Sequence, residues 1–340
     1  MTSRLILFAL SLGLLSAVAR PPDDLQQKLN DWVKGQPGGV SAVWVDQDGA
    51  VFFNAGHLDS AASPAPTADT FYEIGSITKV FTALMLAESE RQGKVSLQDP
   101  AAKFLLPAKD AAQESLQKIT LVSLATHQSG LPRLPGNLAN NLGSNLDPYA
   151  DYTRGDLLAA LRTHGRTAEV GRFIQYSNFG FAVLGTALAS AWGETYDDAL
   201  RTHILTPLGM KGSKLGMLGK PSPSPMAPGL SQGKPVTEWK FLAMAPAGAL
   251  RSSTQEMALF AKAALQLDDS PLREAFERSF EVQAPHPDMG GSIGLAWMLF
   301  THGSDSFAWH NGATAGHRAA IVLNRTKKSG LVVLTNISNA

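Results

Sequence analysis

The sequence predicts an α+β fold in which one antiparallel sheet, flanked by helices, carries an inserted all-α lobe. The evidence is that strand-like segments gather at both ends of the chain. They are Val40–Val45, Ala50–Phe53, Gly294–Phe300, Phe307–His310, His317–Leu323 and Leu331–Asn336. Between them, residues 94–240 show mainly helical patches and loops. We therefore expect a discontinuous sheet domain over residues 20–93 and 241–340, and a helical lobe over residues 94–240.

Turn and helix signals place the individual elements. The Gln47-Asp48-Gly49 segment predicts a tight turn between the first two strands, because Asp-Gly favours a positive φ. Further turns are expected at Gly303, Gly312 and residues 327–330. Apolar residues at helical spacing predict the helices, which are Asp23–Val33, Ser76–Gln92, Leu157–Leu161, Phe179–Trp192, Tyr196–Leu205 and Met257–Leu267.

The composition excludes several classes of chemistry. The chain has 340 residues, 29 Lys and Arg against 29 Asp and Glu, and no cysteine. Without cysteine there are no thiol nucleophiles, disulfides or thiolate metal sites. The balanced charge and the pI of about 7.1 argue against nucleic acid as a partner. A chain of this length is long for one compact domain, which suggests two packed lobes.

The first 19 residues resemble a cleavable export signal. Arg4 precedes an apolar run, and Ala17-Val18-Ala19 supplies the small residues of a cleavage site, so we expect cleavage after Ala19. The alternative is an uncleaved anchor, but the apolar run is shorter than the ~20 residues that span a bilayer. No later segment is apolar enough to span one. We therefore expect a periplasmic or secreted protein without stable membrane insertion.

Ser76 and Lys79 form the first candidate catalytic pair. At three positions apart near a helix start, their side chains share one face, so the amine can contact the hydroxyl. The amide groups at the helix N-terminus favour a developing negative charge. A buried lysine can lose its proton near neutral pH and then activate the serine. Ser-x-x-Lys alone is a weak signal, because chance matches occur in a chain of this length.

Two later segments strengthen the catalytic interpretation. Tyr176-Ser177-Asn178 lies at the start of the Phe179–Trp192 helix, where tyrosine could relay a proton and asparagine could hold an amide. The simpler alternative for this segment is a helix N-cap. His310-Asn311-Gly312 ends a predicted strand. Each segment alone is weak, but their order and their places on these elements point to one site.

Together these segments resemble the penicillin-recognising serine hydrolases, with class C β-lactamases and the related D-alanyl-D-alanine peptidases and esterases as the nearest group. The resemblance covers nearly the whole mature chain and implies a serine β-lactamase-like fold. It also rests on further strings, which are Phe71–Leu84, Gly93–Pro100, Ile119–Leu121, Leu124–Pro132, Pro207–Met210 and Pro246–Gly248.

The resemblance implies a role for each residue of the site. Ser76 would be the acylating nucleophile, Lys79 its proton partner, and Tyr176 the base or acid of acylation and deacylation. The backbone N–H groups of Ser76 and Ala313 would form the oxyanion hole. Substrate binding would involve Asn178, His310, Asn311 and Gly312. No metal or cofactor is implied, the partner would be a small-molecule substrate, and a monomer is expected.

The chain departs from the family at two places. His310 replaces the usual lysine of the third motif, and histidine is only partly charged at neutral pH. Binding of substrate carboxylates should therefore weaken, while neutral esters should suffer less. Arg318 either replaces the missing charge or is a surface arginine. Relatives usually follow the last strand with a helix, so either the chain is part of a longer one or the sheet is covered otherwise.

Other apparent motifs carry less weight. Gly229–Gly233 matches a nucleophile elbow at Ser231, but it follows a Pro-rich loop and precedes Lys234-Pro235, so we expect a turn. No histidine pair has zinc-protease spacing. His317 either lines the cleft or is structural, and His127 is expected to make buried hydrogen bonds.

Three functions follow from this site. The first is a class C-like hydrolase that opens β-lactam or D-alanyl amide bonds through an acyl-Ser76 intermediate. The second is a carboxylesterase with the same nucleophile, favoured by His310. The third is a penicillin-binding protein that turns over slowly. The intact Ser76, Lys79 and Tyr176 argue against an inactive protein.

Overall fold

The computed structural model describes residues 21–60, 62–138, 147–165 and 168–338. The expected signal segment, residues 1–19, lies outside these ranges. Within them, no helix combines the length and the apolar character that crossing a membrane requires.

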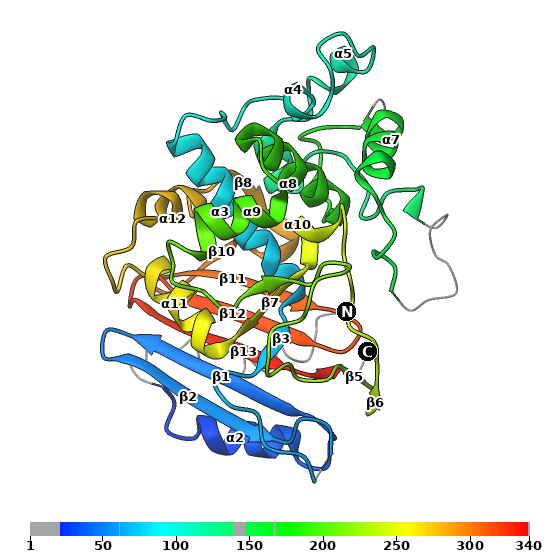
Figure 1. The fold of residues 1–340 in the computed structure, drawn as a ribbon. Helices are drawn as coiled ribbons and strands as arrows, with labels where there is room; N and C mark the ends of the chain where they lie inside the picture. The colour runs from blue at the N-terminus through cyan, green and yellow to red at the C-terminus, as the bar shows by residue number, and fades with distance from the viewer. Residues whose placement is uncertain (1–20, 61, 139–146, 166–167, 339–340) are drawn as a thin grey trace.

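The central feature is an eight-stranded sheet in which each strand is antiparallel to its neighbours (Figure 1). Its strands in spatial order are β2(Gly49–Gly56), β1(Gly39–Asp46), β13(Ser329–Thr335), β12(Arg318–Asn324), β11(Asp305–Ala313), β10(Met298–His302), β9(Gly291–Ile293) and β8(Ala284–His286). The first hairpin joins the C-terminal strands where β1 pairs with β13, with Val40 opposite Thr335. The predicted sheet from both chain ends is confirmed.

Two small three-stranded sheets lie beside the large one. One consists of β3(Phe71–Glu73), β7(Leu250–Ser253) and β4(Lys214–Leu215), with β7 in the middle. The other consists of β14(Ile337–Ser338), β5(Leu230–Ser231) and β6(Lys234–Pro235). The first of these matters for the site, because β3 ends directly before the segment that carries Ser76.

Helices cover the large sheet and form a layer beyond it. They are α2(Leu25–Val33), α3(Thr78–Arg91), α4(Ala102–Leu105), α5(Gln113–Leu116), α6(Leu121–Ala125), α7(Arg154–His164), α8(Asn178–Trp192), α9(Tyr196–Leu200), α10(Ala245–Gly248), α11(Thr254–Ala264) and α12(Arg273–Ser279). Single turns add η2(Gly75–Ile77), η5(Arg201–Leu205) and η6, residues 287–289. In Figure 1, α2 lies on one side of the sheet, and α3, α8, α11 and α12 lie on the other. Each predicted helix has a counterpart here.

The sheet separates two hydrophobic cores. Alternate side chains of β1 point to opposite faces, so Val40, Ala42 and Trp44 pack with α2. Val43 and Val45 belong instead to the larger core on the α3 side. Helix α3 runs through this larger core, and its residues from Thr78 to Ser89 are all buried. A lysine within that stretch is therefore removed from water.

Two sequence predictions were wrong at the C-terminal strands. The segment Gly294–Phe300 is not one strand, because β9 ends at Ile293 and β10 begins at Met298. Ala296 has a φ of 64° in between, and its N–H donates to the carbonyl of Ala125, which fixes a turn there. Gly312 is not a turn residue but lies inside β11, opposite Ala319.

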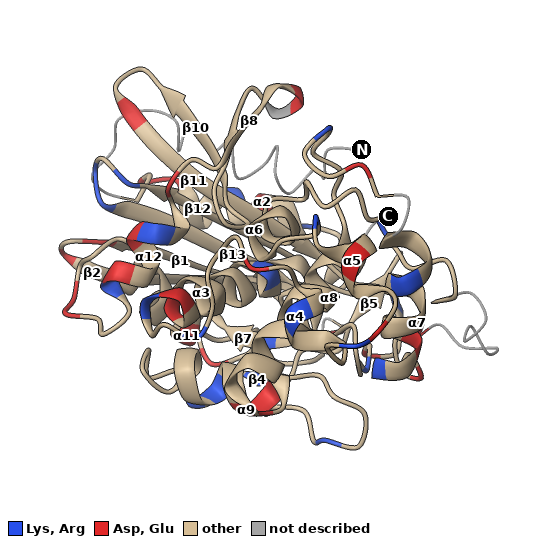
Figure 2. Ribbon diagram, turned by 90° about the horizontal axis from the view of Figure 1, so that it is seen from above, with Lys and Arg blue, Asp and Glu red and all other residues tan. Residues whose placement is uncertain are grey.

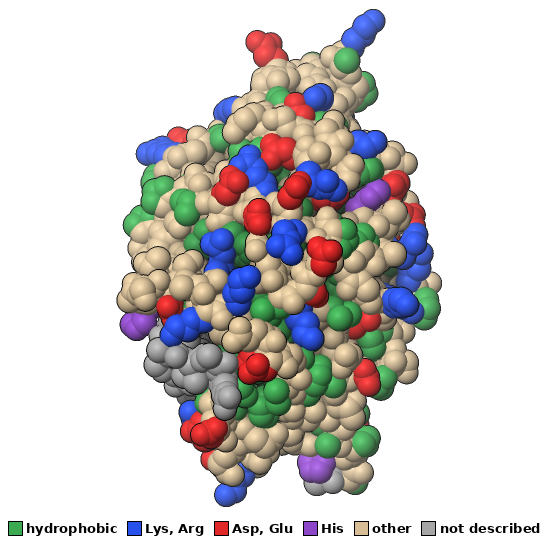
Figure 3. Space-filling view, turned by 90° about the vertical axis from the view of Figure 1, so that its left-hand side faces the viewer, with side chains coloured by type: hydrophobic (Ala, Val, Ile, Leu, Met, Phe, Trp, Pro, Cys, Tyr) green, Lys and Arg blue, Asp and Glu red, His purple; other side chains and the backbone are tan. Residues whose placement is uncertain are grey.

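Charged side chains of both signs are spread over the molecule. Figure 2 shows acidic and basic residues scattered among the helices and strand ends, and Figure 3 shows the two signs intermixed on one face. Charge of one sign therefore does not dominate the faces that these views display.

Candidate active site

Ser76 lies where a strand, a 3-10 turn and a helix meet. Strand β3 leads into η2, which carries Ser76, and α3 follows at once. Gly75 has a φ of +51°, and a Cβ at this position would lie 2.6 Å from the backbone nitrogen of Ala313. Only glycine therefore lets the Ser76 turn approach β11 so closely. The serine itself is half-buried, while the residues on both sides of it are buried.

Lys79 contacts the serine from the first turn of α3. Its Nζ lies 3.0 Å from Ser76 Oγ and donates to the carbonyl of Ala247 at 2.6 Å. The side chain is fully buried. Burial, together with the positive charge of Arg133, holds the pKa of Lys79 well below its usual range. The amine therefore loses its proton far more readily than a surface lysine does.

Tyr176 completes the group from the N-terminus of α8. Ser177 caps this helix by accepting from the N–H of Gly180 at 2.8 Å. The Ser76 side chain is near enough to the Tyr176 hydroxyl to act on its pKa, and Lys79 Nζ lies 4.9 Å from the centre of the Tyr176 ring. Burial raises the pKa of Tyr176 to about 12, although Ser76 and Arg133 act in the opposite direction. The tyrosine is therefore protonated at neutral pH.

His127 holds the tyrosine segment in place. Its Nδ1 accepts from the N–H of Ser177 at 3.1 Å, and its carbonyl accepts from Gln175 at 2.8 Å. The rings of His127 and Tyr176 lie 4.5 Å apart between centroids. The predicted buried hydrogen bond of His127 is confirmed, and its ring contact with the catalytic candidate is an addition that the sequence did not reveal.

Strand β11 forms the wall opposite η2. A Cβ on Gly312 would lie 1.8 Å from the carbonyl oxygen of Ile74, so a side chain here would push the strand away from Ser76. The next residue, Ala313, lines the same pocket as Ser76. Because Gly75 lies against the backbone of Ala313, and Gly312 lies against that of Ile74 and Ser76, the Ser76 and Ala313 amide groups are held close together.

His310 does not present a charge to this pocket. It is 2% exposed, and its Nδ1 donates to the carbonyl of Asn311 at 2.7 Å. Burial and the neighbouring Lys79 lower the pKa of His310 to about 3. The expectation of a partly charged histidine at neutral pH was therefore wrong, because the ring is removed from water next to another basic group.

Aromatic side chains from two loops line the pocket beside Ser76. Tyr149 stacks on Phe241 at 5.0 Å and meets Trp239 edge-on at 5.3 Å. The lining residues are Ser76, Tyr149, Asn178, Trp239, Phe241, Met244, Ala247, Gly248 and Ala313. Sequence analysis missed Tyr149 and Trp239, since no motif marks them.

Asn178 is placed to bind an amide group. Its side chain opposes the rise in the pKa of Tyr149 that burial causes. Its buried Oδ1 has no hydrogen-bond partner within the described part of the chain. A buried acceptor without a partner is costly, so a substrate N–H at this position would be stabilised. Asn178 thus lies on the same pocket wall as the aromatic residues.

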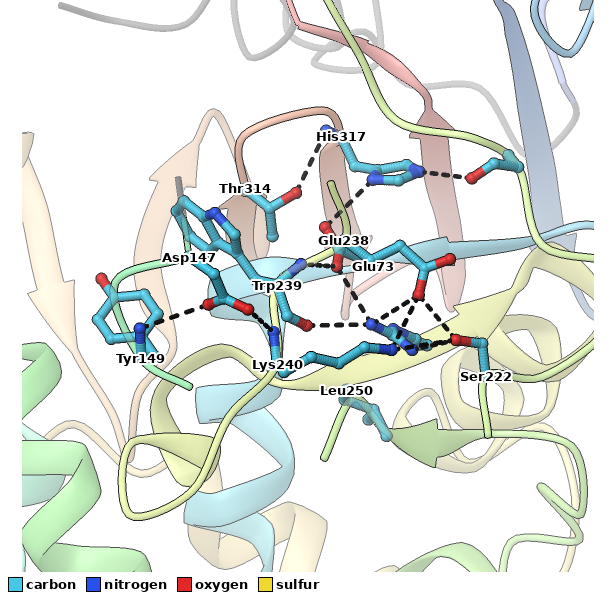
Figure 4. A network of polar contacts seen from close by, with 12 residues as sticks. Glu73, Asp147, Tyr149, Ser222, Glu238, Trp239, Lys240, Leu250, Thr314 and His317 are labelled. Carbon is cyan, nitrogen blue, oxygen red and sulfur yellow. Dashed lines mark hydrogen bonds and ion pairs between the residues drawn. The ribbon is translucent and has the colours of Figure 1, made fainter. Parts of the chain in front are cut away.

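A buried polar network anchors the base of the site (Figure 4). The Glu73 carboxylate accepts from the N–H of Trp239 at 2.9 Å and lies 3.3 Å from His317 Nδ1. Arg251, 1% exposed, approaches it at 3.5 Å. Burial alone would raise the pKa of Glu73, but His317, Thr314 and Arg251 outweigh it and keep that pKa low. His317 is therefore a structural residue of the network.

Asp147 connects the two aromatic loops. One oxygen accepts from the N–H of Tyr149 at 3.4 Å, and the other accepts from the N–H of Lys240 at 2.7 Å. Figure 4 shows this carboxylate between the two segments. The bridge fixes Tyr149 relative to Trp239, the neighbour of Lys240.

The two remaining candidates, Arg318 and Ser231, make other contacts. Arg318, next to Ala313 across β11 and β12, donates to the carbonyls of Thr314 at 2.7 Å and His317 at 2.9 Å. Ser231 lies on β5, which a short turn connects to β6, so the predicted turn is confirmed. Across residues 21–338, the described positions contain no group of three or more His, Asp or Glu residues suited to a metal ion.

This arrangement is that of a serine hydrolase with a lysine and a tyrosine beside the nucleophile. The family model described as Beta-lactamase matches residues 24–340. The chain therefore belongs to the beta-lactamase family of serine hydrolases.

Individual relatives agree with this assignment. The D-alanyl-D-alanine-carboxypeptidase/endopeptidase AmpH of Escherichia coli K12 is 35% identical over 174 residues, which are 51% of this chain and 44% of AmpH. Protein flp of Staphylococcus aureus MW2 is 26% identical over 94% of this chain and 65% of flp. The chain thus spans less than two thirds of either relative. A class C beta lactamase structure from Rhodobacter sphaeroides has a TM-score of 0.79 at 19% identity, covering 94% of this chain and 95% of that one. It shares the fold, which confirms the expected serine β-lactamase-like architecture.

Proposed function

We propose that this protein opens β-lactam or D-alanyl amide bonds through an acyl-Ser76 intermediate. The observation that carries the proposal is the 3.0 Å contact of Ser76 Oγ with the buried Lys79 Nζ, which itself lies 4.9 Å from the centre of the Tyr176 ring. The similarity to AmpH, named as a D-alanyl-D-alanine carboxypeptidase and endopeptidase, supports D-alanyl amides as substrates. The class C fold supports β-lactams.

Acylation follows from the protonation states of the three groups. Neutral Lys79 accepts the Ser76 proton while Oγ attacks the substrate carbonyl carbon. The backbone N–H groups of Ser76 and Ala313 stabilise the oxyanion. Tyr176, protonated because its pKa is about 12, donates its proton to the leaving nitrogen and regains one from the Lys79 ammonium. The amide bond is then broken and the acyl group is on Ser76.

Deacylation reverses the direction of proton transfer. A water molecule attacks the acyl carbon and gives its proton to the Lys79 and Tyr176 pair, and Ser76 Oγ takes a proton back as it leaves. Asn178 holds the amide of the acyl group through its unpartnered Oδ1. Asn311 and Gly312 act through the backbone of β11, which sets the distance of Ala313 from Ser76.

A carboxylesterase with the same nucleophile is the second candidate. It is favoured by the burial and neutrality of His310, which leaves the third motif without the cation that would attract a substrate carboxylate. Both candidates predict an acyl-Ser76 intermediate, so only the substrate distinguishes them. For either one, we propose an exported protein, in agreement with the leader-like residues 1–19.

Intact mass after mixing with a penicillin tests the function directly. A covalent adduct that clears with turnover is expected for a β-lactamase. A persistent adduct would identify a slowly turning-over penicillin-binding protein, and no adduct on the folded protein would favour the esterase. The Ser76→Ala variant should form no adduct and hydrolyse neither substrate class. Unchanged hydrolysis by this variant would refute the nucleophile assignment.

A further inference from the structure

Arg133 lies beside the catalytic group although no catalytic motif includes it. It follows Pro132, and its carbonyl accepts from the N–H groups of Asn178 at 2.9 Å and Phe179 at 3.3 Å. Its guanidinium carbon lies 5.0 Å from the centre of the Tyr176 ring. The residue is therefore attached to the N-terminus of α8 by its backbone, while its exposed side chain extends over the catalytic tyrosine.

Among the described residues, the charge of Arg133 has no acidic partner. Other arginines of the same lobe are paired, for example Arg162 with Asp110 at 2.8 Å and Arg172 with Glu169 at 2.5 Å. No ion pair involves Arg133 among the described residues, and the undescribed segments contain neither aspartate nor glutamate. Its positive charge also acts on the site, since it lowers the pKa of Lys79 and opposes the rise at Tyr176 and Tyr149.

The surroundings indicate which part of a substrate would meet this charge. Asn178, whose backbone N–H is bound by Arg133, lines the pocket and offers its unpartnered Oδ1 to an amide. Under the proposed function that amide belongs to the acyl part of the substrate. A substituent beyond it therefore comes within reach of a solvent-exposed guanidinium, which binds carboxylates through two parallel hydrogen bonds.

We propose that Arg133 binds a carboxylate on the acyl side of the scissile bond and makes the enzyme selective for acyl groups that carry one. This inference rests on the proposed function for the position of the acyl group. It differs from recognition of a leaving-group carboxylate, because the Arg133 carbonyl accepts from the N–H of Asn178, the residue that holds the acyl amide. Arg318, the arginine next to Ala313, donates instead to two backbone carbonyls.

The test compares two substrates with the same scissile bond and leaving group. One carries a carboxylate on its acyl side chain and the other carries a carboxamide at the same atom. We expect kcat/KM of the wild-type enzyme to be at least about tenfold higher for the carboxylate, because one charged hydrogen-bonded pair provides a difference of this size. Arg133→Gln should remove this preference, and Arg133→Lys should restore part of it. The readout is the ratio of the two kcat/KM values, because any effect of Arg133 on Lys79 and Tyr176 changes both substrates equally.

Arg172→Gln is the matched control. Arg172 is also exposed and also lies over an aromatic ring, with its guanidinium carbon 4.9 Å from the centre of the Phe173 ring, so the same charge is lost. The control should keep the wild-type preference. An equal loss for both substrates in Arg133→Gln would show that Arg133 only supports Tyr176, and would overturn the proposal.

Binding to the Ser76→Ala variant separates this proposal from the proposed function. The Kd values of the two compounds are measured on Ser76→Ala with and without Arg133→Gln. Tighter binding of the carboxylate that depends on Arg133 supports the proposal even where neither compound is hydrolysed by the wild type. Equal binding of the two compounds to Ser76→Ala contradicts it, whatever the hydrolysis results are.

Discussion

Burial shifts the pKa values of Lys79 and Tyr176 in opposite directions, lowering the first and raising the second. Burial favours the uncharged form of both, so the lysine becomes a stronger proton acceptor at neutral pH and the tyrosine remains a proton donor. Lys79 Nζ lies 3.0 Å from Ser76 Oγ and 4.9 Å from the centre of the Tyr176 ring. Lys79 can therefore accept the proton of Ser76 while Tyr176 donates one to the leaving group, and both side chains are uncharged before the reaction.

This pair predicts the pH dependence of acylation. Because Lys79 must be neutral, kcat/KM should rise with pH through the lowered pKa of Lys79 and then reach a plateau. Within the pH range where the protein stays folded, kcat/KM should not fall until the pH approaches the pKa of Tyr176, about 12. Lys79→Arg, which cannot lose its proton, should lower kcat by about 10²–10⁴. A falling limb between pH 7 and 9 would contradict the assignment of Tyr176 as the proton donor.

Gly312 predicts a steric effect on catalysis. A Cβ at this residue would lie 1.8 Å from the Ile74 carbonyl oxygen, so Gly312→Ala must displace β11 from the Ser76 turn. We expect a loss of about 10²–10³ in kcat, as for removal of one oxyanion donor. Gly155→Ala in α7 is the control, since its Cβ would meet only Thr153 Oγ1 at 3.5 Å. A fully active Gly312→Ala enzyme would mean that the separation of Ser76 and Ala313 does not control the rate.

At the level of elements, the two aromatic loops depend on Asp147. The carboxylate binds the backbone N–H of Tyr149 on one loop and of Lys240 on the other. It does not line the pocket itself, whereas Tyr149 and Trp239 do. Asp147 is therefore a positioning residue that acts on substrate binding through these two side chains.

Replacing Asp147 should accordingly change KM more than kcat. Asp147→Ala removes both acceptors and frees the loops, so KM should rise about tenfold, the equivalent of one or two lost hydrogen bonds. Asp147→Asn keeps one acceptor oxygen and should have a smaller effect. Steady-state kinetics with one substrate provide both parameters. A fall in kcat at constant KM would assign Asp147 to the chemical step instead.

The elements show what local sequence patterns predict and where they fail. The contact of Ser76 with Lys79 was predictable, because three positions along a helix fix it regardless of the rest of the fold. The single strand Gly294–Phe300 was wrong, since apolar residues continue through the turn at Ala296 and conceal it. The charge state of His310 was also wrong, because it depends on burial beside Lys79, a residue distant in the sequence.

Arg133, Tyr149 and Trp239 could not be predicted for a related reason. Each is an ordinary residue in a loop, and only the assembled fold brings it to the pocket or to Tyr176. Only the family resemblance predicted that the segments of Ser76, Tyr176 and His310 would meet in one site. Their spacing along the chain does not determine their distances.

At the level of the whole molecule, buried histidines predict acid sensitivity. His310 has a pKa of about 3 in the folded protein against 6.5 as its ordinary value, and burial also holds the pKa of His127 well below 6.5. Below pH 6.5 the unfolded chain therefore binds more protons than the folded protein does. Each histidine should lower the free energy of unfolding by up to about 1.4 kcal/mol per pH unit as the pH falls from there.

Chemical denaturation at several pH values measures this effect. Between pH 6.5 and 4.5, above the ordinary pKa of glutamate, the wild-type free energy of unfolding should fall steadily. His310→Asn should reduce the slope, while His302→Asn, at an exposed residue, should leave it unchanged. An unaltered slope in His310→Asn would show that His310 is not held neutral.

The pairing of the first hairpin with the last long strand has a consequence for how the protein folds. The Gly39 N–H donates to Asn336 Oδ1 across 297 positions of sequence, and β1 lies between β2 and β13. Contacts this far apart require a large loop to close first, which slows folding. Until β13 is in place, one edge of the hairpin stays unpaired and is exposed to other chains. During synthesis this edge is therefore open to aggregation until β13 has been made and has paired with β1.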